Sequence, residues 1–132
     1  MFSTGGKAYV YLCYGIHHLF NIVANTKGIP EAVLVRAIEP LEGLTVMQER
    51  RNYRQNSKRL TTGPGNMSQA LGITTALNGI TLNGNLIWLE EHQQPDEQEI
   101  KSSPRIGVSY AGADARLPWR FYLKHSPFTS KL

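Results

Sequence analysis

The chain has 132 residues, a formal net charge of +4 and a sequence pI of about 9.4. Its 41% of hydrophobic and 18% of charged residues exclude a disordered segment and describe one domain that buries its own core. No apolar run approaches the roughly 20 residues of a membrane-spanning helix, and no basic-then-apolar leader follows Met1. The single cysteine, Cys13, suits a reducing compartment, so we expect a cytoplasmic protein with no membrane partner.

The first predicted elements are two strands, at Ala8–Cys13 and residues 18–24, with a tight connection between them. Tyr9 and Tyr11 share one face of the first strand, because side chains on a strand repeat every second residue. Tyr14 is followed by a glycine, which allows a sharp turn that pushes the ring outward. This arrangement suits a protein that stacks one planar ring and wedges another into a gap, as nucleobase-handling proteins do. Ordinary packing of tyrosines in a sheet is the alternative.

A turn at residues 25–28 leads to a third predicted strand at residues 32–38, antiparallel to the second. In this strand Leu34, Arg36 and Ile38 face one way, and the residues between them face the other. A charged side chain that alternates with apolar ones is unusual in a purely structural strand. Arg36 is therefore expected to have a specific partner.

Two helices are predicted in the middle of the chain. Pro40 opens the first, since proline suits the first helical turn, and its far end carries a basic run. The run contains no acidic residue and consists of Arg50, Arg51, Arg54, Lys58 and Arg59. The second helix covers residues 66–71, follows a Gly-Pro-Gly segment and is closed by Gly72. The basic run indicates either a face for a polyanion or a solvated helix end, and composition leaves both open.

Further strands are predicted at residues 86–89, 105–110 and 120–124, with a polar and poorly ordered loop at residues 90–104. The fold class is therefore α+β: one domain with a curved, mainly antiparallel sheet and a few flanking helices. The four histidines and the single cysteine have no metal-ligand spacing, so no metal is expected.

Five blocks of the chain, taken in order, carry a resemblance to a known family. They are Tyr9-Val-Tyr-Leu-Cys-Tyr-Gly15 with Asn21, residues 33–43, residues 63–72, residues 105–108, and residues 118–122 with Ser126 and Pro127. Together they resemble the alkyladenine (3-methyladenine) DNA glycosylases of base-excision repair, over a stretch from about Gly5 to the end. The resemblance implies an enzyme that flips an alkylated or deaminated purine out of duplex DNA and hydrolyses its N-glycosidic bond, leaving an abasic site. It further implies a monomer, without metal or cofactor, whose partner is damaged double-stranded DNA and whose location in a bacterium is the nucleoid.

Carried over by position, Tyr14 is expected to enter the minor groove as a wedge, and Tyr11 to form one wall of the purine pocket. Asn21 and Leu34 are expected to line that pocket, where Asn21 crowds the exocyclic amine of guanine. The structural alternatives are a core or surface ring for each tyrosine and a satisfied sheet amide for Asn21.

Arg36 is expected to hold the attacking water together with the backbone carbonyl of Ile106; a structural ion pair with Glu39 or Glu42 is the alternative. Gly63 and Gly65, at a helix N-terminus, offer backbone N–H groups to a DNA phosphate. The other expected DNA contacts are Ile16, His17 and Asn66. Asn66 stands where a lysine is common in the family, which weakens that contact.

The resemblance also places the general base, a glutamate, in an N-terminal segment that this chain does not contain. We therefore expect residues 1–132 to be the C-terminal two-thirds of one glycosylase domain, impaired in hydrolysis because a positioned base contributes roughly 10²–10⁴-fold in rate. Neither Glu31, Glu39 nor Glu42 is expected to replace it. The alternatives are a non-catalytic remnant that binds damaged or abasic DNA, and a small basic nucleic-acid-binding domain unrelated to repair.

Overall fold

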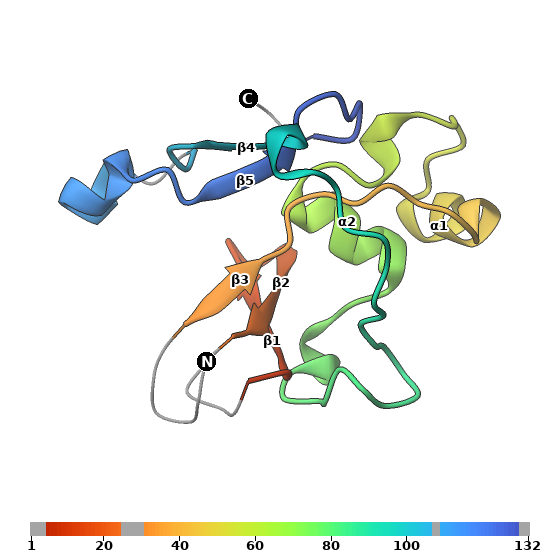
Figure 1. The fold of residues 1–132 in the computed structure, drawn as a ribbon. Helices are drawn as coiled ribbons and strands as arrows, with labels where there is room; N and C mark the ends of the chain where they lie inside the picture. The colour runs from red at the N-terminus through yellow and green to blue at the C-terminus, as the bar shows by residue number, and fades with distance from the viewer. Residues whose placement is uncertain (1–4, 25–30, 107–108, 130–132) are drawn as a thin grey trace.

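The structure is a computed structural model that describes residues 5–24, 31–106 and 109–129. The turn expected at residues 25–28 lies outside the described residues. The strands are β1 (Ala8–Cys13), β2 (His17–Val23), β3 (Ala32–Leu34), β4 (Ile100–Ser103) and β5 (Arg120–Leu123) (Figure 1). The helices are α1 (Leu44–Arg51) and α2 (Pro64–Leu71), with short 3₁₀ turns η1 (Lys58–Leu60), η2 (Thr75–Leu77), η3 (Glu97–Glu99) and η4 (Ser109–Arg116). The α+β class expected from the sequence is confirmed.

The strands form two antiparallel sheets, one of order β1-β2-β3 and one that pairs β4 with β5. In the larger sheet Tyr9 lies opposite Asn21, and Asn21 lies opposite Leu34. Residues directly opposite one another share a face of the sheet. This register therefore places one residue from each of three strands in a single row.

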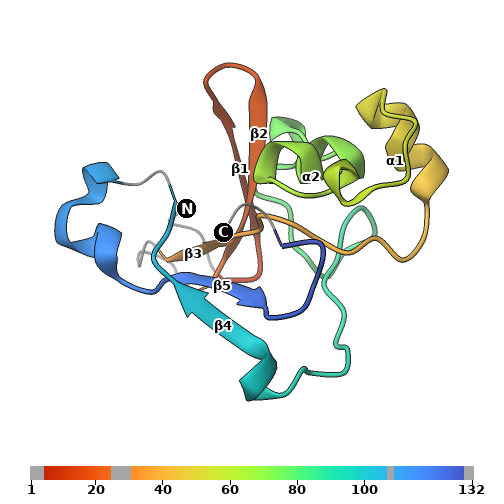
Figure 2. The same ribbon diagram turned by 90° about the horizontal axis from the view of Figure 1, so that it is seen from above.

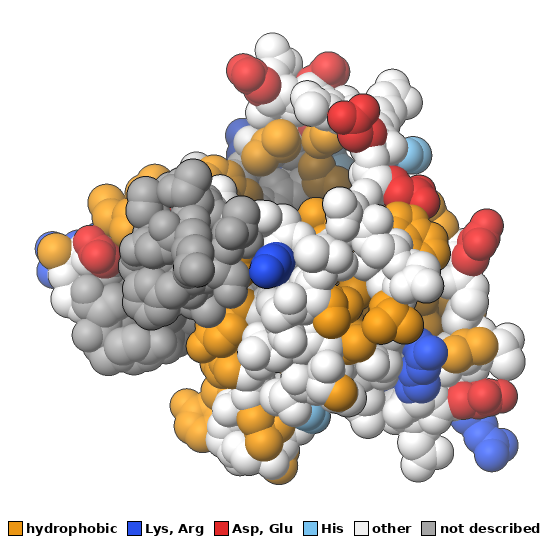
Figure 3. Space-filling model, turned by 90° about the horizontal axis from the view of Figure 1, so that it is seen from below, with side chains coloured by type: hydrophobic (Ala, Val, Ile, Leu, Met, Phe, Trp, Pro, Cys, Tyr) orange, Lys and Arg blue, Asp and Glu red, His pale blue; other side chains and the backbone are white. Residues whose placement is uncertain are grey.

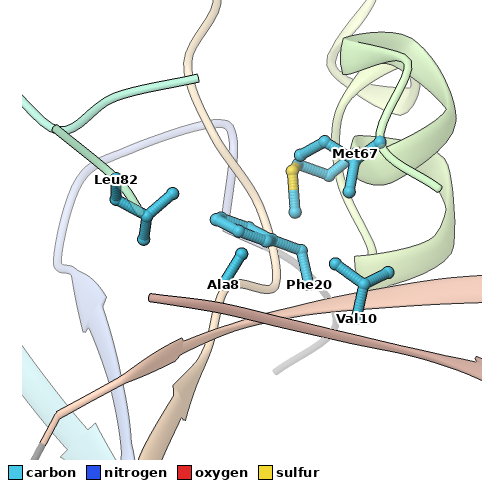
Figure 4. Packing of buried hydrophobic residues seen from close by; sticks show 6 residues of the cluster. Ala8, Val10, Phe20, Met67 and Leu82 are labelled. Atoms are coloured by element: carbon cyan, nitrogen blue, oxygen red, sulfur yellow. The ribbon is translucent and has the colours of Figure 1, made fainter. Parts of the chain in front are cut away.

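The other face of the larger sheet forms the main core. Ala8, Val10 and Phe20 pack against Met67 of α2 and against Leu82, and all five are buried. Figure 4 shows the Phe20 ring between Leu82 and Met67, above the strands. The alternation of β1 thus separates the buried Ala8 and Val10 from the two tyrosines, which lie on the opposite face.

Each of the two α-helices ends at a residue with left-handed backbone conformation, and each is preceded by a glycine at its N-cap. Gly72 closes α2 at φ 70°, as expected, and Pro64 occupies the first turn of that helix. The prediction that Pro40 opens the first helix is wrong, because α1 begins at Leu44. Gly43, at φ 80°, caps it in a conformation that favours glycine. Pro40 lies before it, outside any helix or strand.

Three strand predictions need correction. The segment at residues 32–38 remains a strand only to Leu34; Val35 and Ile38 both pack against the core, so the expected alternation breaks there. Residues 86–89 form a single bridge, between Asn83 and Trp88. In the segment at residues 105–110, Arg105 and Ile106 lie outside any strand, and η4 begins at residue 109.

The loop expected at residues 90–104 contains a strand that the sequence pattern did not show. β4 has the sequence Ile-Lys-Ser-Ser and is mostly exposed, so it lacks the apolar alternation of a half-buried strand. Its residues pair with β5 from Ile100 opposite Leu123 to Ser103 opposite Arg120. Backbone pairing with a distant segment, rather than burial, makes it a strand.

Part of the basic run serves the fold. Arg50 donates a hydrogen bond to the carbonyl of Ala70 at 3.1 Å, near the C-terminus of α2. Arg51 donates to two carbonyls of η1, at 3.2 and 3.0 Å. The exposed basic side chains that remain for a polyanion are Arg54, Lys58 and Arg59.

Several large hydrophobic side chains are exposed, and hydrophobic groups are spread over the face shown in Figure 3. The most exposed are Tyr14, Ile16, Leu41, Leu86 and Phe121. In the described ranges no helix is long and apolar enough to cross a membrane. Among the same residues, no three His, Cys, Asp or Glu side chains gather as a metal site requires.

Candidate nucleic-acid interface and base-binding cleft

The tip of the β1–β2 hairpin presents an aromatic ring to solvent. Tyr14 and Gly15 both have positive φ, 53° and 70°, and the N–H of Ile16 donates to the carbonyl of Cys13 at 3.2 Å. This is the φ pattern of a type I′ turn, where asparagine and glycine are the usual residues. The Tyr14 side chain is 91% exposed. Figure 2 shows the hairpin projecting away from β4 and β5, with α2 beside β2.

The structure brings the hairpin tip and the start of α2 together. A Cβ added to Gly65 would lie 2.6 Å from Nδ1 of His17, so the imidazole rests directly on the backbone of the helix. Ile16 is 70% exposed beside it. The predicted DNA contacts at Tyr14, Ile16, His17 and Gly65 therefore share one region of the surface.

Gly63 and Asn66, the other two predicted phosphate contacts, lie in the same turn at the start of α2. Gly63 precedes Pro64 at φ 95°, and no side chain caps the helix. The Asn66 amide donates to the carbonyl of Thr62 at 3.0 Å. This bond engages the Asn66 side chain in local structure and leaves fewer of its groups for DNA.

A cleft of about 990 Å³ lies against the tyrosine face of the larger sheet. One side of it is lined by β1 to β3 and the segment that follows β3, and the other by the C-terminal residues around β5. All five residues predicted to line the base pocket or hold the water contribute to it, namely Tyr11, Asn21, Leu34, Arg36 and Ile106.

The sheet side of the cleft is a wall suited to a planar ring. Tyr9 and Tyr11 have ring centroids 5.3 Å apart and an interplanar angle of 35°. The row Tyr9, Asn21 and Leu34 continues this wall across three strands. Stacking of a nucleobase on an aromatic and aliphatic surface of this kind has a favourable free energy.

Asn21 is buried, at 7% exposure, and is held by the backbone. Its Nδ2 donates to the carbonyl of Tyr9 at 3.2 Å and to that of Leu19 at 3.4 Å. Because two carbonyls surround the nitrogen, the amide orientation is fixed by its partners. The alternative of a satisfied sheet amide is thus partly correct: the Asn21 side chain hydrogen-bonds to backbone carbonyls of the sheet and also lines the cleft.

Arg36 is half-buried in the cleft wall. Burial lowers the pKa of Arg36 below its ordinary value, and the positive charge of Arg120 lowers this pKa further. Arginine nevertheless keeps its proton at neutral pH, so Arg36 presents a permanent donor group to the cleft.

The sequence indicated no role for several residues that the cleft contains. These are Arg105, Trp119, Arg120 and Tyr122. One signal was present, since Arg120 is a charged residue within a predicted strand, as Arg36 is. The C-terminal side of the cleft depends on tertiary structure, which places residues of β5 in the same lining as those of β3.

Comparison with known proteins gives the family. A family model described as methylpurine-DNA glycosylase matches residues 1–127. The chain belongs to this family.

Similar proteins are named "Putative 3-methyladenine DNA glycosylase". The protein of this name from Bacillus cytotoxicus is 42% identical over 99% of this chain and 69% of its own length. Those from Methanocella arvoryzae and Chlorobaculum tepidum are each 45% identical, over 65% and 61% of their own lengths. The chain thus spans about two-thirds of the length of these relatives. The family resemblance seen in the five sequence blocks is confirmed.

Proposed function

We propose that this chain acts in DNA repair as a glycosylase on alkylated or deaminated purines of the 3-methyladenine type. One observation carries the proposal. An exposed tyrosine stands on a hairpin tip, and a cleft large enough for a nucleotide begins three residues away, at Tyr11. Proteins that work on a single base must unstack it, and a wedge with an adjoining pocket does both parts of that work.

In this proposal Tyr14 enters the duplex and fills the gap that the everted nucleotide leaves. The purine stacks on the wall of Tyr9 and Tyr11, where stacking contributes on the order of 1–3 kcal/mol per base. A cationic alkylated purine gains further from the electron-rich faces of the rings. Asn21, fixed by two backbone carbonyls, gives the pocket a rigid edge that discriminates among purines.

Hydrolysis then requires a water at the sugar carbon and a group that takes its proton. We assign the positioning of the water to Arg36 and to the backbone carbonyl of Ile106, both of which line the cleft. Glu39 is the one carboxylate among the described residues of this lining, and it is exposed. An exposed carboxylate is not held against a reacting water, so we propose that residues 1–132 alone hydrolyse the bond slowly, about 10²–10⁴-fold below a complete site.

The test measures binding and turnover separately. Binding is measured by fluorescence anisotropy on a duplex with one abasic-site analogue, and turnover by alkali cleavage of duplexes that contain hypoxanthine or 3-methyladenine. Tyr14→Ala should weaken lesion binding about tenfold, while Arg36→Ala should reduce turnover more than binding. Arg116→Ala is the matched control, because Arg116 is exposed and lies outside the cleft lining.

Each result has a clear meaning. Absence of any preference for lesion duplex over undamaged duplex would refute the proposed function. Binding that depends on Tyr14, without turnover at any pH, would identify the chain as a lesion-binding protein without catalysis. Fast turnover by this chain would show that the proton acceptor lies within it, and Glu39→Gln would then test that residue.

A further inference from the structure

The C-terminal side of the cleft carries charges that the base pocket does not use. Arg105 and Arg120 line it together with Arg36, whereas Glu39 is the sole carboxylate of the lining within the described residues. Three positive charges against one negative charge leave an excess of two. A partly desolvated cavity with such an excess is an environment for an anion.

Arg120 is held in a fixed position. It is 5% exposed, its guanidinium lies 5.0 Å from the centroid of the Tyr122 ring, and its Nη1 donates to Oγ of Ser103 at 3.5 Å. Ser103 lies opposite Arg120 in the β4–β5 ladder, so the second sheet anchors both groups. A guanidinium that is ordered in advance loses little side-chain entropy when it binds a ligand.

Arg105 is arranged in a similar way at the edge of the same cleft. Its guanidinium lies 5.1 Å from the centroid of the Trp119 ring, and it donates to the carbonyl of Asp114 at 3.4 Å. Both arginines thus rest on aromatic rings contributed by the C-terminal segment. Through the planar edge of its guanidinium, arginine makes bidentate contacts with phosphate and carboxylate groups.

The charge of the proposed substrate decides which anion fits. A purine alkylated at a ring nitrogen is cationic, so three arginines would repel the base itself. The deoxyribose that carries the base, however, has a phosphate on each side, and each phosphate has a full negative charge. An anion beside Arg120 would also reduce its repulsion of Arg36, a repulsion that contributes to the lowered pKa of Arg36.

We propose that Arg120, assisted by Arg105, binds the backbone phosphate adjacent to the everted nucleotide while the purine lies on the wall of Tyr9 and Tyr11. This subsite deepens the proposed function and rests on it. It holds the sugar between two fixed surfaces, one for the base and one for the phosphate. It also neutralises part of the charge that a cationic purine would otherwise meet.

The direct test changes the DNA and leaves the protein intact. Single methylphosphonates, which are neutral, are placed at each phosphate in turn of a duplex that carries one abasic-site analogue, and binding of the unaltered chain is measured. A neutral group at one of the two phosphates that flank the analogue should weaken binding roughly ten- to hundredfold, as expected when a hydrogen bond between charged groups is lost. A loss of less than about twofold at both positions would overturn the inference.

The second arm assigns the contact to Arg120. In Arg120→Gln the same methylphosphonate should cost less than about twofold, because the partner of the phosphate is already absent. In Arg116→Gln, the exposed control, it should cost as much as in the unaltered chain. A full penalty retained in Arg120→Gln would refute the assignment.

The salt dependence of binding gives an independent measure. The slope of log K against log salt concentration should fall by about 0.9 in Arg120→Gln, which corresponds to one phosphate contact. If Arg120→Gln fails to fold, Arg105→Gln and Arg120→Lys are tested in its place. A smaller loss of binding on methylphosphonate substitution in both variants supports the subsite. An unchanged loss of binding in both refutes it. A chain that prefers lesion duplex through Tyr14 but shows no phosphate effect would retain the proposed function and lose only this inference.

Discussion

Tyr14 is the residue whose replacement best separates stability from function. Its backbone lies in the left-handed region at φ 53°, next to Gly15 at φ 70°. For a residue other than glycine, asparagine or aspartate this conformation costs roughly 1–2 kcal/mol. Because the Tyr14 side chain is 91% exposed, burial returns little of that free energy. The turn therefore holds Tyr14 in a strained backbone conformation, although the exposed ring contributes little to the stability of the fold.

Asparagine is the residue that most readily adopts this conformation before glycine in a hairpin turn. Tyr14→Asn should therefore raise the free energy of unfolding by about 1 kcal/mol, which corresponds to about 3–5 °C in unfolding temperature for a domain of this size. The same substitution removes the wedge, so lesion binding should fall about tenfold. Stability and binding are thus expected to change in opposite directions.

The assay combines urea or thermal unfolding with anisotropy titration of a duplex that carries an abasic-site analogue. Gly15→Ala is the control for backbone strain. A Cβ at Gly15 would meet no atom within 4 Å, so its expected cost of about 1–2 kcal/mol comes from φ 70° alone. A lower unfolding temperature in Tyr14→Asn would show that the ring packs on the protein. Unchanged lesion binding would show that it is not the wedge, and either result would refute the reasoning.

Three further predictions concern other parts of the molecule. Gly65→Ala should weaken DNA binding, because the added Cβ would lie 2.6 Å from Nδ1 of His17 and displace that ring. The unfolding temperature should stay unchanged or rise, since alanine favours a helix by roughly 0.5–1 kcal/mol over glycine. Equal DNA binding by Gly65→Ala and the unaltered chain would contradict this prediction. Asn21→Ala should lower the free energy of unfolding, measured in urea, by about 1–3 kcal/mol, since two backbone carbonyls lose their donor. It should also raise the binding of everted guanine relative to hypoxanthine. An unchanged purine preference would show that Asn21 does not contact the base. Arg51→Ala should lower the free energy of unfolding by about 1–2 kcal/mol, because two hydrogen bonds to backbone carbonyls are lost. Arg54→Ala should change the free energy of unfolding by no more than about 0.5 kcal/mol and weaken only the salt-sensitive part of DNA binding. Equal losses of stability in the two variants would show that Arg54 also stabilises the fold.

Local signals in the chain were sufficient for the hairpin and for the end of α2, although α2 begins at Pro64, two residues before the predicted start. Alternation over Ala8–Cys13 separated the core residues of β1 from its two tyrosines, and Gly15 marked the turn that presents Tyr14. Gly72 marked the end of α2. In each case the signal and the structure it specifies lie within a few residues, so no distant partner is needed to interpret it.

Local signals failed where pairing or competing turn chemistry decides. β4 has no apolar alternation and exists because β5 supplies its hydrogen-bonding partner. Pro40 is compatible with a helix start, but the left-handed conformation of Gly43 delays α1 to Leu44. The strand predicted at residues 32–38 ends early because its last residues turn toward the core.

Residues 11, 14, 21 and 36 acquired their expected roles from the sequence, through their resemblance to a family of repair enzymes. The cleft itself, its row across three strands and the arginines opposite that row appear only in the folded chain. The physical reason is distance along the chain. The wall of tyrosines and the guanidinium of Arg120 come from opposite ends of the sequence, and only tertiary packing places them on two sides of one cavity.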